Sequence, residues 1–128
     1  PFFDTTHSNN ISNTLSLINI NSIKDFEKKI NKKIEFERFR GNIYMDGINA
    51  WNERNWLNKT IKINNVLFKV TNHIARCSAT NLKPNSDNVT INLPLILNKN
   101  YNHIDMGVYL IPLNNGNINI NDKIIINE

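Results

Sequence analysis

The segment TIKINNVLFKV, residues 60–70, is the clearest structural signal in this chain. Branched or aromatic apolar residues stand at every second position on both sides of the pair Asn64-Asn65. When apolar residues repeat at every second position, their side chains lie on one face of a strand. A polar pair between two such runs is typical of a tight turn. The segment therefore predicts a β-hairpin with one apolar face.

Shorter apolar runs on either side of the hairpin extend this strand pattern. The apolar residues of 15–18 indicate a short buried segment, after a polar, turn-rich stretch over 1–13 that predicts an irregular loop. Aromatic and branched residues over 39–45 predict a strand that ends in a turn at Asp46-Gly47. The last predicted elements are a strand over 108–113, a turn at Asn115-Gly116, and closing strands at Ile118, Ile120 and 124–126.

Two segments have the pattern of short helices. Ser22 is a residue type that caps helices, and Ile23, Phe26 and Ile30 follow it at helical spacing. Lysines 28, 29, 32 and 33 would lie on the polar side of this helix and favour its C-terminal end. Residues 93–97 predict a second short helix. Many short strands with two small helices predict a mainly β domain, either a barrel or a sandwich.

The composition predicts one domain over residues 1–128 with a core of its own. The formal net charge of +4 comes from scattered cations, which fits a solvated surface or an anionic ligand and does not indicate nucleic-acid binding. The apolar runs are far shorter than the ~20 residues that span a bilayer, so we expect no membrane span. Because the chain starts at Pro1 without Met, we expect a fragment or a processed chain.

Cys77 is the only cysteine of the chain. A lone thiol forms no disulfide within one chain, so it is either a small buried apolar residue or a chemical group. It follows Arg76, whose charge would lower the pKa of the thiol, and it separates a predicted strand from a polar loop. These surroundings favour a reactive or metal-binding thiol over a buried, inert one. A single cysteine also fits a reducing compartment, so we expect a cytoplasmic protein.

Other candidate groups carry a weaker signal when each is taken alone. His73 or His103 would form a nucleophile–base pair with Cys77, although a surface or hydrogen-bonded histidine is the simpler interpretation. Arg38 and Arg40 would point the same way on a strand, either as solvated charges or as a grip on phosphate.

Three further positions could contribute to a ligand site. Asn42 offers both a donor and an acceptor. Asp105 and Tyr109 lie near Gly107, where a backbone without a side chain can approach a ligand closely.

Taken in order, these segments resemble one family, the MOSC domain, which is the C-terminal domain of molybdenum cofactor sulfurases. The resemblance is to the MOSC proteins similar to the mitochondrial amidoxime-reducing component and its bacterial counterparts. The ordered set covers nearly the whole chain and is fairly specific, although each piece is weak alone. The segments are Ser16-Leu17-Ile18-Asn19, Arg38 to Gly47, Trp51 and the Trp56 segment (both expected as packing anchors), Arg76 to Asn81, and Gly107-Val108-Tyr109.

The resemblance implies a MOSC-type β-barrel with a few short helices, and it implies the molybdenum cofactor, a molybdenum–molybdopterin. Cys77 falls at the position of the catalytic residue that ligates the metal. Arg40 and Asn42 match the family's Arg-Phe-Arg-x-Asn cofactor segment, and Arg76 and Tyr109 fall at further cofactor-contacting positions. Thiolate is a soft ligand that suits a sulfur-coordinated metal, and arginine forks suit the phosphate of the cofactor.

The implied activity is a molybdenum-dependent oxidoreductase, or the catalytic part of one, that reduces N-hydroxylated compounds such as hydroxylamines and amidoximes. Asp46 or Asp105 is a candidate proton relay. Because the chain has no cysteines for an iron–sulfur cluster, the electrons would come from a separate donor protein. Pyridoxal phosphate would belong only to a fused sulfurase domain, which residues 1–128 do not contain.

The chain departs from the family pattern in two places. Residues 1–128 do not contain the N-terminal β-barrel domain that usually completes the cofactor site, and the late Gly-Asp turn appears as Asn121-Asp122. Two other interpretations therefore stay open. One is a sulfur-carrier or cofactor-delivery protein in which Cys77 bears a persulfide, and the other is a non-catalytic fragment.

Overall fold

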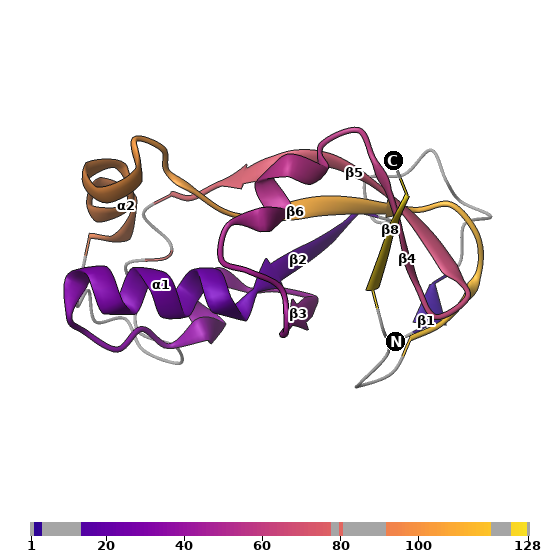
Figure 1. The fold of residues 1–128 in the computed structure, drawn as a ribbon, viewed down its shortest axis with the longest axis horizontal. Helices are drawn as coiled ribbons and strands as arrows, with labels where there is room; N and C mark the ends of the chain where they lie inside the picture. The colour runs from indigo at the N-terminus through magenta and orange to yellow at the C-terminus, as the bar shows by residue number, and fades with distance from the viewer. Residues whose placement is uncertain (1, 4–13, 78–79, 81–91, 119–123, 128) are drawn as a thin grey trace.

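Six strands form one curled sheet in the order β3-β2-β6-β5-β4-β8, with the shape of a half-barrel (Figure 1). The computed structural model describes residues 2–3, 14–77, 80, 92–118 and 124–127. β2 and β3 are parallel, and all other neighbours in the sheet are antiparallel. The strands of the sheet are β2 (Leu15–Asn19), β3 (Ile43–Met45), β4 (Thr60–Ile63), β5 (Val66–Ala75), β6 (Asp105–Pro112) and β8 (Ile124–Asn127). The expected mainly β fold is confirmed.

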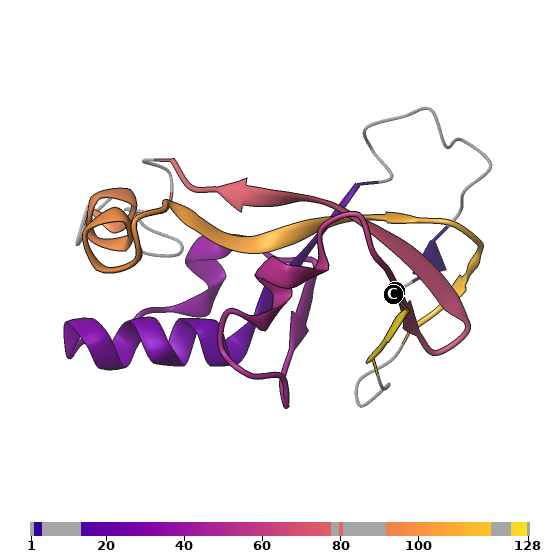
Figure 2. The same ribbon diagram turned by 45° about the horizontal axis from the view of Figure 1, so that its top comes forward.

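Two helices lie together at one end of the molecule, on the left in Figures 1 and 2. They are α1 (Ile20–Ile30), which follows β2 directly, and α2 (Leu93–Tyr101). Two short 3₁₀ turns complete this half, η2 (Phe36–Phe39) and η3 (Asn52–Trp56). A two-stranded ribbon of β1 (Phe2–Phe3) and β7 (Gly116–Asn117) lies at the opposite end. Within the described residues, no helix has the length and apolar character needed to cross a membrane.

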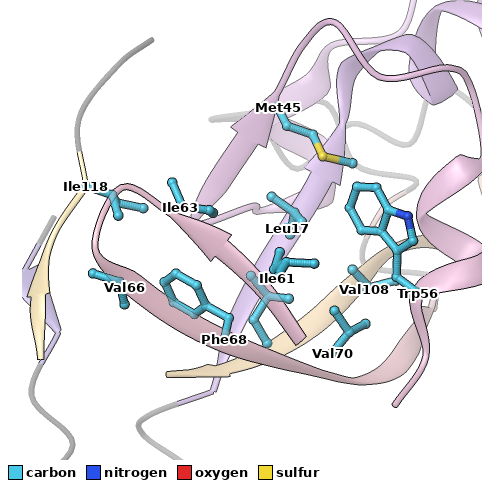
Figure 3. Close-up of a cluster of buried hydrophobic side chains, with 11 residues drawn as sticks. Leu17, Met45, Trp56, Ile61, Ile63, Val66, Phe68, Val70, Val108 and Ile118 are labelled. Atoms are coloured by element: carbon cyan, nitrogen blue, oxygen red, sulfur yellow. The ribbon is translucent and has the colours of Figure 1, made fainter. Parts of the chain in front are cut away.

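The predicted hairpin is confirmed as β4 and β5. Ile61 pairs with Phe68 and Ile63 with Val66, and all four side chains are buried. They face the inside of the curled sheet, where Trp56, Leu17 and Val108 join them (Figure 3). Removal of a large apolar side chain from water contributes roughly 1.5–3 kcal/mol, so this cluster is a main source of stability.

A second apolar cluster fills the space between the helices and the sheet. α1 contributes Ile23 and Phe26, α2 contributes Leu93 and Leu97, and the sheet contributes Ile18, among others. The helices are therefore held to the end of the sheet at which β5 stops. This arrangement positions the residues that follow β5.

Among the described residues, asparagine provides four of the six positions with positive φ that are not glycine. Asn31 and Asn102 end α1 and α2 with φ of 53° and 60°, and each backbone N–H bonds to a carbonyl of the last helical turn. Asn64 in the hairpin turn and Asn58 have φ of 54° and 65°. Asn tolerates this region better than most residues because its short polar side chain can bond locally.

Gly107 lies where β6 approaches β2 most closely. Its φ is +92°, and a Cβ there would be 2.6 Å from Ile18 Cδ1 and 2.8 Å from the Leu17 carbonyl oxygen. The register between β5 and β6 shifts here, between His73 and Ala75. Close packing of β6 against β2 is therefore enough to require glycine at this position.

Several local predictions were wrong. Asn19 caps α1, since its side chain accepts from the Asn21 N–H, whereas Ser22 is buried inside the helix. The strand predicted over 39–45 begins only at Ile43, because η2 precedes it and Arg40 is left-handed with φ of 51°. Arg38 and Arg40 therefore do not share the face of a strand. Phe2–Phe3 is a strand rather than part of a loop, and Gly116 belongs to β7, with the bend at 113–114.

Ile118, predicted in a closing strand, lies just after β7 and outside any strand, although its side chain is buried. The remaining elements agree with their predictions. The second helix contains the predicted 93–97 and extends to Tyr101, and β6 and β8 lie where strands were expected. Gly47 has φ of +80° in the turn that follows β3. Ile120 and Asn121-Asp122 lie outside the described residues.

Candidate functional site

The guanidinium of Arg76 joins two segments that are distant in the sequence. Its Nε and Nη2 donate to the Met106 carbonyl at 3.0 and 2.6 Å, and its Nη1 donates to the Phe39 carbonyl at 2.8 Å. It also lies over the Phe39 ring, 5.2 Å from the centroid. Because Arg40 follows Phe39 and Cys77 follows Arg76, one side chain fixes the backbone next to two predicted site residues.

Burial lowers the pKa of Arg76 to about 10. Tyr109, Tyr44 and Cys77 act in the opposite direction, so these groups lie close enough to interact with the guanidinium. The side chain still carries its charge at neutral pH. Its hydrogen bonds are therefore charge-assisted, which makes them stronger than bonds between neutral groups.

Cys77 is exposed and has a free thiol. It follows the end of β5, and the Arg76 N–H donates to the Ile104 carbonyl at 2.8 Å just before it. Its own carbonyl accepts from the Thr80 N–H at 3.1 Å and from the Thr80 hydroxyl at 2.8 Å. The backbone is therefore hydrogen-bonded on both sides of the exposed thiol, at Arg76 and at the Cys77 carbonyl.

Asn42 is engaged by the protein through Ser16 of β2. The Asn42 side-chain oxygen accepts from the Ser16 N–H at 2.8 Å and from its hydroxyl at 3.1 Å. In return, the Asn42 N–H donates to the Ser16 hydroxyl at 2.9 Å, and Ser16 also donates to the Arg40 carbonyl at 3.2 Å. Ser16 thus holds the Arg40–Asn42 segment against the sheet.

Tyr109 lies opposite Ser16 in the β2–β6 register, so the two side chains share a face of the sheet. It is 38% exposed. Within the described part of the chain, neither its hydroxyl nor the guanidinium of Arg40 has a hydrogen-bonding or ionic partner. Arg40 is exposed as well.

The predicted site residues therefore divide into two groups. Arg76 and Asn42 are bonded to the protein itself and build the local framework. Arg40, Cys77 and Tyr109 present a guanidinium, a thiol and a phenol that are exposed. All five belong to one region. Ser16 bonds to the Arg40–Asn42 segment and pairs with Tyr109 in the sheet register. Arg76, the residue before Cys77, bonds to the carbonyl of Phe39, the residue before Arg40.

The two histidines considered as bases for Cys77 have other partners. His73 Nε2 lies 3.3 Å from the Arg54 carbonyl, and its Nδ1 is 3.6 Å from Asp105. His103 accepts from the Asp105 N–H at 3.0 Å and stacks on Tyr101. Desolvation lowers the pKa of His103, and the Arg54 charge adds to this.

The two candidate proton relays differ in their surroundings. Asp105 forms an ion pair with Arg54 at 2.9 Å. Asp46 is exposed, and its carboxylate accepts from the adjacent Gly47 N–H.

Sequence reasoning missed the connecting roles of Ser16 and Phe39. Ser16 appeared only as part of a resembling segment, and Phe39 acts through its carbonyl, a group that every residue has. Arg38 was considered a phosphate ligand but is buried, bonded to Glu35 at 2.6 Å and to the Thr80 carbonyl at 3.4 Å.

The exposed groups fit a ligand that carries both a soft metal and an anion. Thiolate suits soft metals, and a guanidinium binds phosphate in a bidentate manner. In the described ranges, no three His, Cys, Asp or Glu side chains are grouped so that they could hold a metal ion. Cys77 is therefore the candidate protein ligand.

Comparison with known proteins agrees with this fold. Residues 4–125 match the family model of the MOSC domain. The crystal structure of YiiM from Geobacillus stearothermophilus is similar, with a TM-score of 0.67, 16% sequence identity and coverage of 89% of this chain and 54% of that one. The chain thus spans about half the length of that structure. No curated protein matches it in sequence.

Proposed function

Since this chain belongs to the MOSC domain family, we propose that it is the molybdenum-cofactor-binding domain of a reductase that acts on N-hydroxylated compounds. The observation that supports the proposal is the exposed thiol of Cys77, next to the partly buried cation Arg76 and in the same region as the exposed Arg40. A reducing compartment would keep this thiol free, so a cytoplasmic location belongs to the proposal.

Each residue has a defined role in this proposal. Cys77 would ligate the metal as a thiolate, and Arg40 would bind the phosphate of the cofactor through its fork of donors. Tyr109 would donate from its hydroxyl. Arg76 and Asn42 would act as positioning residues, because their side chains are already bonded to the protein.

The reaction converts an N–OH group into N–H and water, and it consumes two electrons and two protons. When bound, the cofactor would supply the two-electron chemistry. The electrons would come from a separate donor protein. Asp105 is a candidate for proton transfer, because it pairs with Ala75 in the β5–β6 register. Ala75 precedes Cys77 by two residues, so Asp105 lies beside the strand that leads to the thiol.

Metal analysis of the full-length protein that contains this chain tests the proposal. We expect molybdenum to co-purify with the native protein and to fall at least about tenfold in Cys77→Ser, since the metal would lose its thiolate ligand. Lys69→Ser, at an exposed position of β5, is the control and should retain the metal. Equal molybdenum in the native protein and Cys77→Ser would contradict the proposal.

The same exposed thiol also suits a sulfur carrier, because a donor and an acceptor must both reach a persulfide. In that case, mass spectrometry after treatment with a persulfide donor would show added sulfur at Cys77. Loss of molybdenum in Cys77→Ser without any added sulfur in the native protein would favour the reductase.

A further inference from the structure

Exposed lysines gather on α1 and on the turn that follows it. Five of the fifteen Lys and Arg residues of the chain fall within residues 24–33. All five are exposed, and we call them the lysine face: Lys24, Lys28, Lys29, Lys32 and Lys33. The C-terminal end of a helix carries a partial negative charge, which stabilises such cations.

The acidic side chains of this segment are bonded inwards. Asp25 accepts from the indole N–H of Trp51 at 2.9 Å and from the Tyr101 hydroxyl at 2.8 Å, and these bonds hold its pKa below the usual value. Glu27 accepts from the Ile34 N–H at 2.7 Å. Five ammonium groups therefore outnumber the two carboxylates of this segment, although Lys29 Nζ also lies over the Tyr101 ring, 5.8 Å from its centroid.

A hollow of about 280 Å³ lies on this surface. Its lining is formed by Glu27, Lys28, Asn31, Lys32 and Lys33. The hollow has room for a protruding side chain. Its three lysines outnumber its one carboxylate, Glu27, so the net positive charge favours a carboxylate from another molecule.

The segment that follows the lysine face is connected to Cys77 through Arg38 and Thr80. η2 begins at Phe36, three residues after Lys33, and its Arg38 bonds to Glu35 and reaches the Thr80 carbonyl at 3.4 Å. Thr80 in turn bonds to the Cys77 carbonyl. Figures 1 and 2 agree with this, since β5 points towards the end of the molecule that carries α1 and α2.

We propose that the lysine face is the docking surface for an acidic electron-transfer protein. The inference rests on the proposed function, because that reaction needs a separate donor. The partner presents carboxylates to the lysines, and opposite charge steers it to the end of the molecule near Cys77. Two reduced one-electron donors supply the two electrons that convert N–OH and two protons into N–H and water.

The test uses the full-length, cofactor-loaded protein with hydroxylamine as substrate and two electron donors. One is an acidic plant-type [2Fe–2S] ferredoxin with its reductase, and the other is reduced methyl viologen, a small cation that needs no docking. The test variant is Lys28→Glu with Lys33→Glu. The matched control reverses two lysines of the β4–β5 hairpin, Lys62→Glu with Lys69→Glu.

We expect the KM for ferredoxin to rise about tenfold in the test variant and less than about twofold in the control. The viologen-supported rate should stay unchanged in both. Added salt should raise the KM for ferredoxin more in the native protein than in the test variant, since salt screens the exposed charges that attract the partner. An unchanged KM in the test variant, or an equal rise in both variants, would overturn the proposal.

Two further outcomes separate this inference from the proposed function. If the native protein turns over with neither donor, the reductase function fails, and a binding titration with oxidised ferredoxin decides the docking question alone. Binding that is lost in Lys28→Glu with Lys33→Glu supports the docking surface, and absence of binding overturns it. Lysine-dependent binding to vesicles of anionic phosphatidylserine, without ferredoxin binding, also overturns it in favour of a membrane surface.

Discussion

Arginine-to-lysine substitution at two positions tests which cations build the site and which face a ligand. Arg76 bonds to the carbonyls of Phe39 and Met106 at once, whereas Arg40 is exposed. Lysine keeps the charge but carries one nitrogen, so it cannot reproduce a planar fork that bridges two carbonyls. We therefore expect the same substitution to have different effects at the two positions.

The magnitude follows from the bonds that lysine cannot make. One carbonyl would lose a charge-assisted hydrogen bond, which costs about 1.5–3 kcal/mol. The contact of the guanidinium with the Phe39 ring at 5.2 Å would weaken by up to about 0.5–1 kcal/mol. Arg76→Lys should therefore lower the free energy of unfolding by about 2–4 kcal/mol. Arg40→Lys should change it by less than about 0.5 kcal/mol, as expected for an exposed side chain.

Urea unfolding at neutral pH, followed by tryptophan fluorescence, measures both changes. The pKa of Arg76, lowered by burial to about 10, keeps the native side chain charged under these conditions. A loss at Arg76 below about 0.5 kcal/mol, or an equal loss at Arg40, would refute the framework role assigned to Arg76. Cofactor retention provides the complementary measurement, since Arg40→Lys should reduce it while leaving the unfolding curve in place.

The remaining predictions concern the surroundings of the site. Gly107→Ala should destabilise the protein by about 3 kcal/mol, because strain at positive φ adds to a clash, whereas Gly47→Ala, with a similar φ and no atom within 4 Å, should cost about 1 kcal/mol in urea unfolding. Glu53→Gln should cost about 2 kcal/mol by chemical denaturation, because the buried carboxylate accepts from Asn19, and loss of less than about 0.5 kcal/mol would contradict this. Desolvation lowers the pKa of His103 in the folded protein, so the unfolded chain binds more protons below the ordinary value of 6.5. Stability should therefore fall as pH drops through that range, and the fall should be smaller in His103→Gln when unfolding is compared at about pH 7.5 and 5.5.

Local sequence patterns predicted those parts of the fold that depend on near neighbours. The β4–β5 hairpin has alternation on both sides of a short turn, so its register follows from the sequence alone. The segment over 39–45 has the composition of a strand, yet Arg38 bonds to Glu35 and to Thr80, and these contacts accompany a 3₁₀ turn. A contact with a residue 42 positions away leaves no local pattern.

The candidate site shows the same division. Cys77 stood out because it is unique and follows a cation. The difference between Arg76 and Arg40 could not be predicted, because the partners of Arg76 are main-chain carbonyls, which have no signature in the sequence. The N-cap residue of α1 was also missed. Asn19 ends an apolar run, whereas Ser22 stands just before the helical pattern and is a common N-cap residue.

The asparagines at Asn31, Asn58, Asn64 and Asn102 affect how mutagenesis of this protein is interpreted. An alanine scan of polar surface positions would record losses at all four, of about 1 kcal/mol each, and such losses resemble those of a binding epitope. Their origin is the shape of the main chain and not recognition of another molecule. Glycine replacement distinguishes the two origins, because it preserves the backbone geometry while deleting the amide. It should restore what alanine removes at Asn31, Asn58 and Asn102, and only part of it at Asn64, whose amide donates to the Asn117 carbonyl at 3.0 Å.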